Sequence, residues 1–102
     1  MDPQQLQTMM AQAQQMAQRL QEEMKTKTAE GQSGGGMVTA TVSGQGDLVK
    51  IKIDPRAVDP RDVSMLEDLV VAAVHDAHSR VKELLATEMR KLAGPMGLPP
   101  MF

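Results

Sequence analysis

MVTATVSGQGDLVKIKI, residues 37–53, is the stretch that decides the fold. Valine and alanine alternate with threonine and serine over residues 38–43, and the alternation resumes in Val49, Lys50, Ile51, Lys52 and Ile53. Because successive side chains of a strand point to opposite faces of a sheet, each run predicts a strand with one apolar face. Residues 43–47, SGQGD, have the length of a hairpin connection. The stretch therefore predicts two antiparallel strands, at about 37–43 and 48–53.

The segment before this hairpin predicts a long helix over residues 3–24. Its apolar residues recur at steps of three and four, which places them on one helical stripe. They are Leu6, Met9, Met10, Ala13, Met16, Ala17, Leu20 and Met24. Asp2 is a candidate N-cap, and Pro3 suits the first helical position. Between this helix and the hairpin, residues 25–30 (KTKTAE) alternate and predict a further short strand.

A second long helix is predicted over residues 64–92. Two Asp-Pro pairs mark the loop before it, since proline cannot occupy a helix interior. Ser64 is the candidate cap, and Glu67 is placed to complete a capping box. Glu88 is the one polar interruption of the apolar face. That face is expected to form the core and the dimer contact through Leu66, Leu69, Val70, Ala73, Ala77, Val81, Leu84 and Leu85. Residues 94–102 are expected to form a flexible tail rich in glycine and proline.

The predicted order is helix, three strands, helix, in one α+β domain over residues 1–93. At 1.5 Å per residue the second helix is about 40 Å long, whereas six or seven residues of strand span about 20 Å. The helices therefore extend beyond the small antiparallel sheet that covers them. Apolar residues continue along the extension, from Ala77 to Leu92, and such a surface is rarely left in water. A second copy of the chain is the simplest cover, so a homodimer is predicted.

Composition excludes several classes of protein. The chain has 102 residues, of which 41% are apolar, and no apolar run approaches the roughly 18 residues of a membrane-spanning helix. It has no cysteine, and its first ten residues lack the pattern of a secretion signal. We therefore expect a soluble, cytoplasmic protein with no membrane partner.

The sequence offers candidates for catalysis and metal binding, but each has a simpler interpretation. The glycine run of residues 31–37, GQSGGGM, is followed by a strand pattern, where a phosphate loop needs a helix N-terminus. A bend with positive φ is the better interpretation. His75 and His78 lie one helical turn apart, but two ligands do not make a metal site. Carboxylate pairs such as Glu22 and Glu23 lack concave surroundings that would shift their pKa values. We expect no enzyme activity, no metal or other cofactor and no small-molecule substrate.

Eleven basic residues are candidates for DNA contact. One surface is expected to combine Lys25, Lys27, Lys50, Lys52, Arg56 and Arg61, and another to combine Arg19, Arg80, Lys82, Arg90 and Lys91 on the helices. Lysines beside hydroxyl side chains, as on the polar face of the predicted hairpin, suit phosphate oxygens and equally suit a solvated sheet. The net charge of −2 counts against nucleic acid as a partner, because DNA-binding proteins are usually basic.

The single aromatic residue, Phe102, narrows the choice of nucleic acid. Single strands and RNA loops are held by stacking on aromatic rings, so a nucleic-acid partner is expected to be duplex DNA contacted through its backbone. No spacing typical of a zinc finger or helix-turn-helix is present, so sequence preference is expected to be weak. The alternative is a protein-binding adaptor that uses methionine-rich helical surfaces, which the ten methionines and the net acidity favour.

Three stretches resemble the bacterial YbaB/EbfC family of nucleoid-associated proteins: GGGMVTATVSGQGDLVKIKIDPRAV, MLEDLVVAAVHDAHSRVKEL and GLPPM. The resemblance covers nearly the whole chain. It implies an α-β-β-β-α protomer, a tweezer-shaped homodimer, DNA binding with limited sequence specificity, and a role in organising the nucleoid or in gene expression. The framework residues that carry it are Gly35, Gly36, Val38, Gly44, Ile53, Asp54, Pro55, Leu66, Asp68, Leu69, Ala73 and Ala77. It supplies no DNA-contact motif, so the contact residues rest on charge and position.

Overall fold

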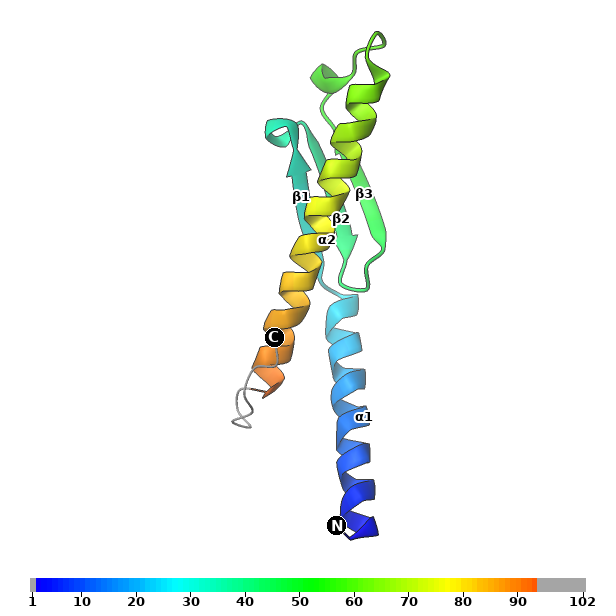
Figure 1. The fold of residues 1–102 in the computed structure, drawn as a ribbon, viewed down its shortest axis with the longest axis vertical. Coiled ribbons are helices and arrows are strands. Elements are labelled where there is room, and N and C mark those ends of the chain that lie inside the picture. Colours follow the sequence, from blue (N-terminus) through cyan, green and yellow to red (C-terminus); the bar gives the residue numbers. More distant parts are fainter. Residues whose placement is uncertain (1, 94–102) are drawn as a thin grey trace.

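In the computed structural model, which describes residues 2–93, two helices accompany a three-stranded sheet (Figure 1). The elements are α1 (Pro3–Lys25), β1 (Thr28–Ser33), β2 (Val38–Ser43), β3 (Leu48–Ile53) and α2 (Val63–Ala93), with 3-10 turns at Gly34–Gly36 and Pro55–Ala57. The predicted α+β order of helix, three strands and helix is confirmed. The expected tail, residues 94–102, lies outside the described residues.

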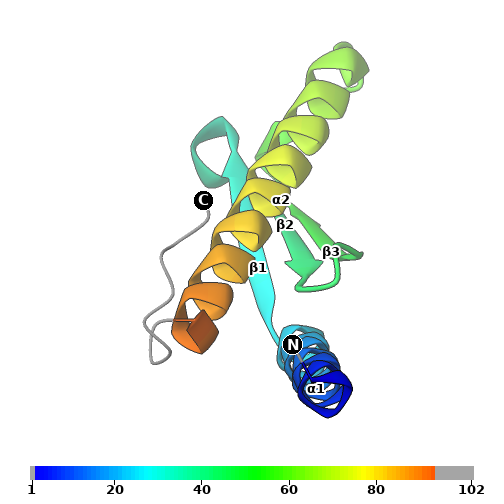
Figure 2. The ribbon, with the colours of Figure 1, turned by 60° about the horizontal axis from the view of Figure 1, so that its bottom comes forward.

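The sheet is antiparallel, with β2 in its centre and β1 and β3 at its edges. α2 lies across one face of it, mainly over β1 and β2 (Figure 2). The buried core between α2 and the sheet consists of Val38, Ala40, Val42, Ala73, Ala77 and Val81. On the opposite face of the sheet, Thr39 is paired with Lys52 and Thr41 with Lys50. The hairpin therefore separates an apolar face from a polar face, as its alternation predicts.

A bulge interrupts the regular alternation predicted for β3. Val42 pairs with Leu48, although Thr41 pairs with Lys50, so Val49 is an extra residue without a partner of its own. Val49 is 61% exposed. The bulge increases the local twist at the edge of the sheet, an effect that no local sequence pattern indicates.

The first strand begins later than the sequence predicts. The predicted range is 25–30, but Lys25 is the last residue of α1, and Lys27 lies in the connection before β1. The shift places Gly31 against α2, where an added Cβ would lie 2.1 Å from the Ala77 nitrogen. Only glycine allows strand and helix to approach so closely, and this tertiary contact sets the position of β1.

The helix ends confirm one predicted cap and correct another. Asp2 caps α1, because its side chain accepts a hydrogen bond from the Gln4 nitrogen at 3.1 Å. The second helix begins at Val63, one residue earlier than expected, and the Asp62 carboxylate accepts from the Met65 nitrogen at 3.2 Å. Ser64 is therefore inside α2 and is not its cap. Asp and Ser both favour the cap position, and the actual start of the helix decides between them.

The three glycines after β1 form a tight left-handed turn. Gly34, Gly35 and Gly36 have φ values of 59°, 67° and 92°, a region that other residues rarely adopt. The turn returns the chain from β1 to β2 and is followed by a strand. The interpretation of this run as a backbone bend is confirmed.

The described part of the chain is strongly elongated, with extents of 69 × 21 × 18 Å. α1 extends away from one end of the sheet. The C-terminal half of α2 extends in the same general direction, and the two helices diverge from each other (Figures 1 and 2). Met24 is the only buried residue of α1. We call α1 and the C-terminal half of α2, residues 78–93, the two arms.

Candidate nucleic-acid interface

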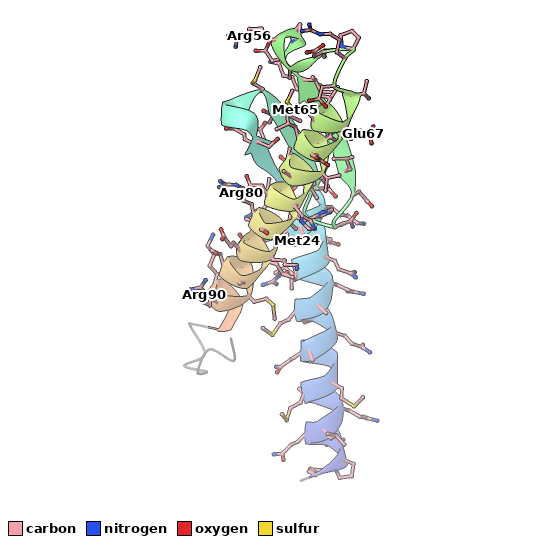
Figure 3. All side chains as sticks on the ribbon, turned by 45° about the horizontal axis from the view of Figure 1, so that its top comes forward. Met24, Arg56, Met65, Glu67, Arg80 and Arg90 are labelled. Atoms are coloured by element: carbon pink, nitrogen blue, oxygen red, sulfur yellow. The ribbon has the colours of Figure 1, made fainter. Side chains whose placement is uncertain are left out.

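The eleven predicted contact residues fall into three regions of the structure. Arg56 and the loop before α2 that contains Arg61 lie at the end opposite the arms (Figure 1), and Figure 3 shows Arg56 at the tip beyond Met65 and Glu67. Lys50 and Lys52 lie on the polar face of the sheet. The other seven lie on the arms or beside their junction with the sheet: Arg19, Lys25, Lys27, Arg80, Lys82, Arg90 and Lys91. The structure therefore does not join Arg56 and Arg61 to the lysines that were expected to share a surface with them.

The two arginines at the far end are held by neighbouring aspartates. Arg56 pairs with Asp54 at 2.7 Å, and Arg61 pairs with Asp59 at 3.1 Å. Each aspartate also accepts a hydrogen bond from the backbone nitrogen of its arginine. Hydrogen bonds from Arg56 lower the pKa of Asp54 to about 2. These pairs organise the turns before α2 and neutralise both guanidinium groups.

Charge is segregated along the molecule. The end that contains the turns and the first half of α2 has six carboxylates against two arginines, a net charge of −4: Asp54, Asp59, Asp62, Glu67, Asp68 and Asp76, with Arg56 and Arg61. The arms and their junction carry seven cations against five carboxylates, a net charge of +2: Arg19, Lys25, Lys27, Arg80, Lys82, Arg90 and Lys91, with Asp2, Glu22, Glu23, Glu83 and Glu88. The small overall charge of −2 thus conceals a basic region and an acidic one.

Four cations of the arms have no ion pair within the described residues: Arg19, Lys25, Lys82 and Arg90. All four are exposed. Lys25 lies in the last turn of α1 and Arg90 in the last turn of α2, positions where a cation also interacts favourably with the helix dipole. Arg80 is exposed as well and pairs with Asp76 at 3.3 Å (Figure 3). These side chains are available to phosphate oxygens.

Asp76 links α2 to the edge of the sheet. Its carboxylate accepts a hydrogen bond from the Gln32 nitrogen at 3.0 Å and one from Arg80 at 3.3 Å. The backbone hydrogen bond from Gln32, followed by the Arg80 contact, lowers the pKa of Asp76. Asp76 therefore accepts from a backbone N–H of the edge strand β1 and also orients the Arg80 guanidinium at the start of the arm.

Glu88 is a functional candidate that sequence reasoning missed. Its side chain is buried, and its carboxylate accepts hydrogen bonds from Lys27 and, at 3.4 Å, from Lys91. The hydrogen bond from Lys27 lowers the pKa of Glu88, and the same contact raises the pKa of Lys27. In the sequence it is visible only as a polar interruption of an apolar face. That interruption is the available signal, because a carboxylate on a core face requires a cation.

The polar face of the sheet is locally neutral. Lys50 and Lys52 are exposed there, but Glu30 on β1 faces the same side through its pairing with Thr41, and Asp47 lies in the hairpin turn. A hollow of about 330 Å³ is lined by Lys52 together with the acidic residue Asp54 and with Gly36, Met37, Thr39, Ile53 and Pro55. Neither feature concentrates positive charge as the arms do.

The eight residues of α2 that were expected to form the core and the dimer contact differ in how deeply they are buried. Ala73, Ala77 and Val81 are buried in the core of the single chain. Leu66, Leu69, Val70 and Leu84 are half-buried, and Leu85 is 37% exposed. The buried residues face β1 and β2, and the partly exposed ones leave apolar surface beside the sheet.

The histidines occupy separate positions. His75 is exposed, whereas the Nε2 atom of His78 lies 3.1 Å from the carbonyl oxygen of Gly46 in the hairpin turn. Among residues 2–93 there is no group of three or more His, Cys, Asp and Glu side chains arranged to hold a metal ion. In the same part of the chain, no helix combines the length and the apolar character that crossing a membrane requires.

Comparison with known proteins identifies relatives over most of the chain. Residues 1–96 match the YbaB/EbfC DNA-binding family. A nucleoid-associated protein of Rhodococcus opacus is 51% identical over 92 residues, 87% of this chain and 81% of that protein. One from Caldanaerobacter subterraneus is 48% identical over 97 residues, 92% of this chain and 87% of that protein. An uncharacterised Helicobacter pylori protein of known crystal structure has a TM-score of 0.74 at 28% identity, covering 94% of this chain and 97% of that one.

Proposed function

Because the chain belongs to the YbaB/EbfC DNA-binding family, we propose that it binds duplex DNA through its two basic arms, as a nucleoid-associated homodimer with weak sequence specificity. The family and the names of the relatives indicate a DNA-binding protein and not an enzyme. A role in chromosome organisation or in the regulation of expression, in the nucleoid of the cytoplasm, is part of the proposal.

The segregation of charge is the observation that carries this proposal. A net charge of +2 on the arms and their junction, against −4 at the opposite end, gives a slightly acidic protein one region that attracts phosphate. Four exposed cations in that region make no internal ion pair among the described residues. Contacts of this kind position a protein on the DNA backbone and carry no information about base sequence.

Burial supports a second copy of the chain as a partner. α2 packs mainly on β1 and β2, so the apolar side of β3 is left largely uncovered. Leu48 is 49% exposed and Ile53 is 36% exposed. A second protomer that packs beside α2 would cover the exposed apolar side of β3. The resulting dimer would have two pairs of arms, which could act as the prongs of a clamp.

A DNA titration over a range of salt concentrations tests the proposal. If a dimer neutralises about four phosphates, the logarithm of the association constant should fall with the logarithm of salt concentration at a slope of about −3.6. A slope near zero, or the absence of binding to duplexes of any sequence, would reject DNA binding by this mode. Equal affinity for several unrelated duplexes supports weak sequence specificity.

Matched charge variants identify the surface. Lys82→Gln/Arg90→Gln removes two cations from an arm, and it should weaken binding and reduce the slope by about 0.9 for each phosphate that is no longer neutralised. Arg56→Gln/Arg61→Gln removes the same charge from the acidic end and should leave the slope unchanged. Lys50→Gln/Lys52→Gln tests the sheet face in the same way. If only this last pair changed the slope, the sheet face would be the DNA-binding surface and the arms would not.

One observation favours a second candidate function, a protein-binding adaptor. Leu6, Met9 and Met10 on α1 are each at least half exposed, at 50%, 55% and 57%. Methionine-rich apolar surfaces adapt to varied protein partners. DNA-independent capture of one dominant partner, abolished in Met9→Gln/Met10→Gln and combined with absence of duplex binding, would favour the adaptor.

A further inference from the structure

The junction between α1 and the sheet is closely packed. Met24, near the end of α1, is 3% exposed. An added Cβ on Gly44 would lie 2.2 Å from the Met24 carbonyl oxygen, so the hairpin approaches α1 as closely as a glycine allows. The Gly44 nitrogen also donates a hydrogen bond to the Lys27 carbonyl oxygen at 2.8 Å. The direction in which the first arm leaves the sheet is therefore set within a few residues.

Glu88 connects this junction to the second arm. Lys27 lies between α1 and β1, whereas Glu88 and Lys91 lie on α2. The Glu88 side chain is 5% exposed, those of Lys27 and Lys91 are 36% and 67% exposed, and both ammonium groups contact the same Oε1 atom. A buried carboxylate is stable only while it is paired and hydrogen-bonded. Releasing Lys27 would leave the longer Lys91 contact as the remaining ion pair of Glu88 among the described residues, so the Lys27–Glu88 pair resists separation of the arms.

We propose that Glu88 is a positioning residue for DNA binding, which fixes the relative orientation of the two arms by holding Lys27 at the base of α1. This inference rests on the proposed function, because it assigns Glu88 to the geometry of the same DNA-binding surface. Apart from the contacts near Glu88 and Met24, α1 has little packing against the rest of the chain, since its other residues are exposed or half-buried. The orientation of the arm thus depends on few contacts.

The sign of a charge-neutralising substitution distinguishes positioning from simple electrostatics. Removing any carboxylate from a basic DNA-binding region should tighten binding, because it removes repulsion from phosphate. A positioning residue behaves in the opposite way, because its removal misplaces cations. Glu83 is an exposed glutamate on the same arm, without an ion pair among residues 2–93, and serves as the matched control.

The first experiment compares duplex binding by Glu88→Gln and Glu83→Gln in the full chain. Glu88→Gln should weaken binding about eight-fold at about 0.1 M salt and reduce the salt slope by about 0.9, the effect of leaving one phosphate without its cation. Glu83→Gln should leave affinity unchanged or raise it. Glu88→Asp, which keeps the charge, should recover part of the affinity. If Glu88→Gln binds as tightly as Glu83→Gln, the proposal is wrong.

A second experiment measures the arms directly and does not depend on DNA. The chain has no cysteine, so Gln14→Cys on α1 and Ser79→Cys on α2, both exposed positions, introduce unique labelling sites. Pulsed EPR of spin-labelled protein diluted with unlabelled protein isolates the distance within one chain. The protein that carries only the two labelling substitutions should give one narrow distance distribution, and so should the same protein with Glu83→Gln added. Adding Glu88→Gln should give a broad distribution, and adding Glu88→Asp an intermediate one.

The two experiments separate the possible failures. If the unaltered protein binds no duplex while Glu88→Gln broadens the distance distribution, the proposed function fails and only the mechanical role of Glu88 remains. An unchanged distribution in Glu88→Gln overturns the positioning role whatever the DNA result. If circular dichroism shows that Glu88→Gln is unfolded, Lys27→Gln removes the same contact from the half-buried partner and should broaden the distance distribution. A narrow distribution in Lys27→Gln would reject the proposal.

Discussion

Asp54 and Arg56 show how a short sequence motif produces a local charge state. Arg56 donates hydrogen bonds to Asp54 from its backbone nitrogen, at 2.9 Å, and from its guanidinium group. We predict that NMR titration gives Asp54 a pKa of about 2, and that Arg56→Gln raises it toward the ordinary 3.8. Because the folded pKa is lowered, the stabilisation is present above about pH 4 and disappears as the pH falls through about 2. An Asp54 pKa that does not respond to Arg56→Gln would contradict this assignment.

Gly31 is the residue where β1 approaches α2. A Cβ there would lie 2.1 Å from the Ala77 nitrogen and 2.5 Å from the Ala73 oxygen, and these backbone atoms cannot move without displacing the helix. We predict that Gly31→Ala destabilises the protein by about 3 kcal/mol or more, as overpacking does in a close contact. Chemical denaturation measures the change.

Gly35 supplies the control for this prediction. It has a φ of 67°, but an added Cβ would meet no atom within 4 Å. Gly35→Ala should therefore cost only the backbone term, about 1–2 kcal/mol. Equal effects of the two substitutions would show that the close contact with α2 does not limit the position of β1.

Among the elements, α1 is the one with least support from the rest of the chain. Its residues other than Met24 are exposed or half-buried, and most of the stability of a helix in a protein comes from tertiary packing. We predict that amides in the first half of α1 exchange with deuterium much faster than those of α2 around Ala73 in the DNA-free protein, and that duplex DNA slows them. Slow exchange without DNA would place α1 in the contact between subunits.

The sequence predicts elements well where the pattern is local and poorly where it depends on distant contacts. The two helices and the hairpin follow from periodicity within a few turns or residues. The start of β1 depends on the fit of Gly31 against Ala77, and the bulge at Val49 has no local signature. The cations of the site are all visible in the sequence as residue types. Their grouping is not, because Lys27 and Glu88 are 61 positions apart in the chain.

At the scale of the whole molecule, the uncovered side of β3 determines the expected assembly. We predict that sedimentation shows a dimer at micromolar concentration, and that Leu48→Lys shifts it toward a monomer because a lysine must then be desolvated at the contact. Leu48 is 49% exposed, so the substitution should leave the fold of the single chain intact. Val58→Lys is the matched control, since Val58 is 52% exposed at the acidic end. A folded monomer at this concentration in the unaltered protein would remove the dimer from the proposal.

The separation of charge along a body 69 Å long also affects how a protomer meets DNA. A molecule with opposite excess charge at its two ends has a permanent electric dipole moment, and the field of a polyanion exerts a torque on it before any contact is made. Each encounter is then biased toward arrival with the arms leading and the carboxylate-rich tip facing away. Fewer collisions are unproductive, so at low ionic strength the association rate should exceed that of a protein of the same net charge with its charges mixed.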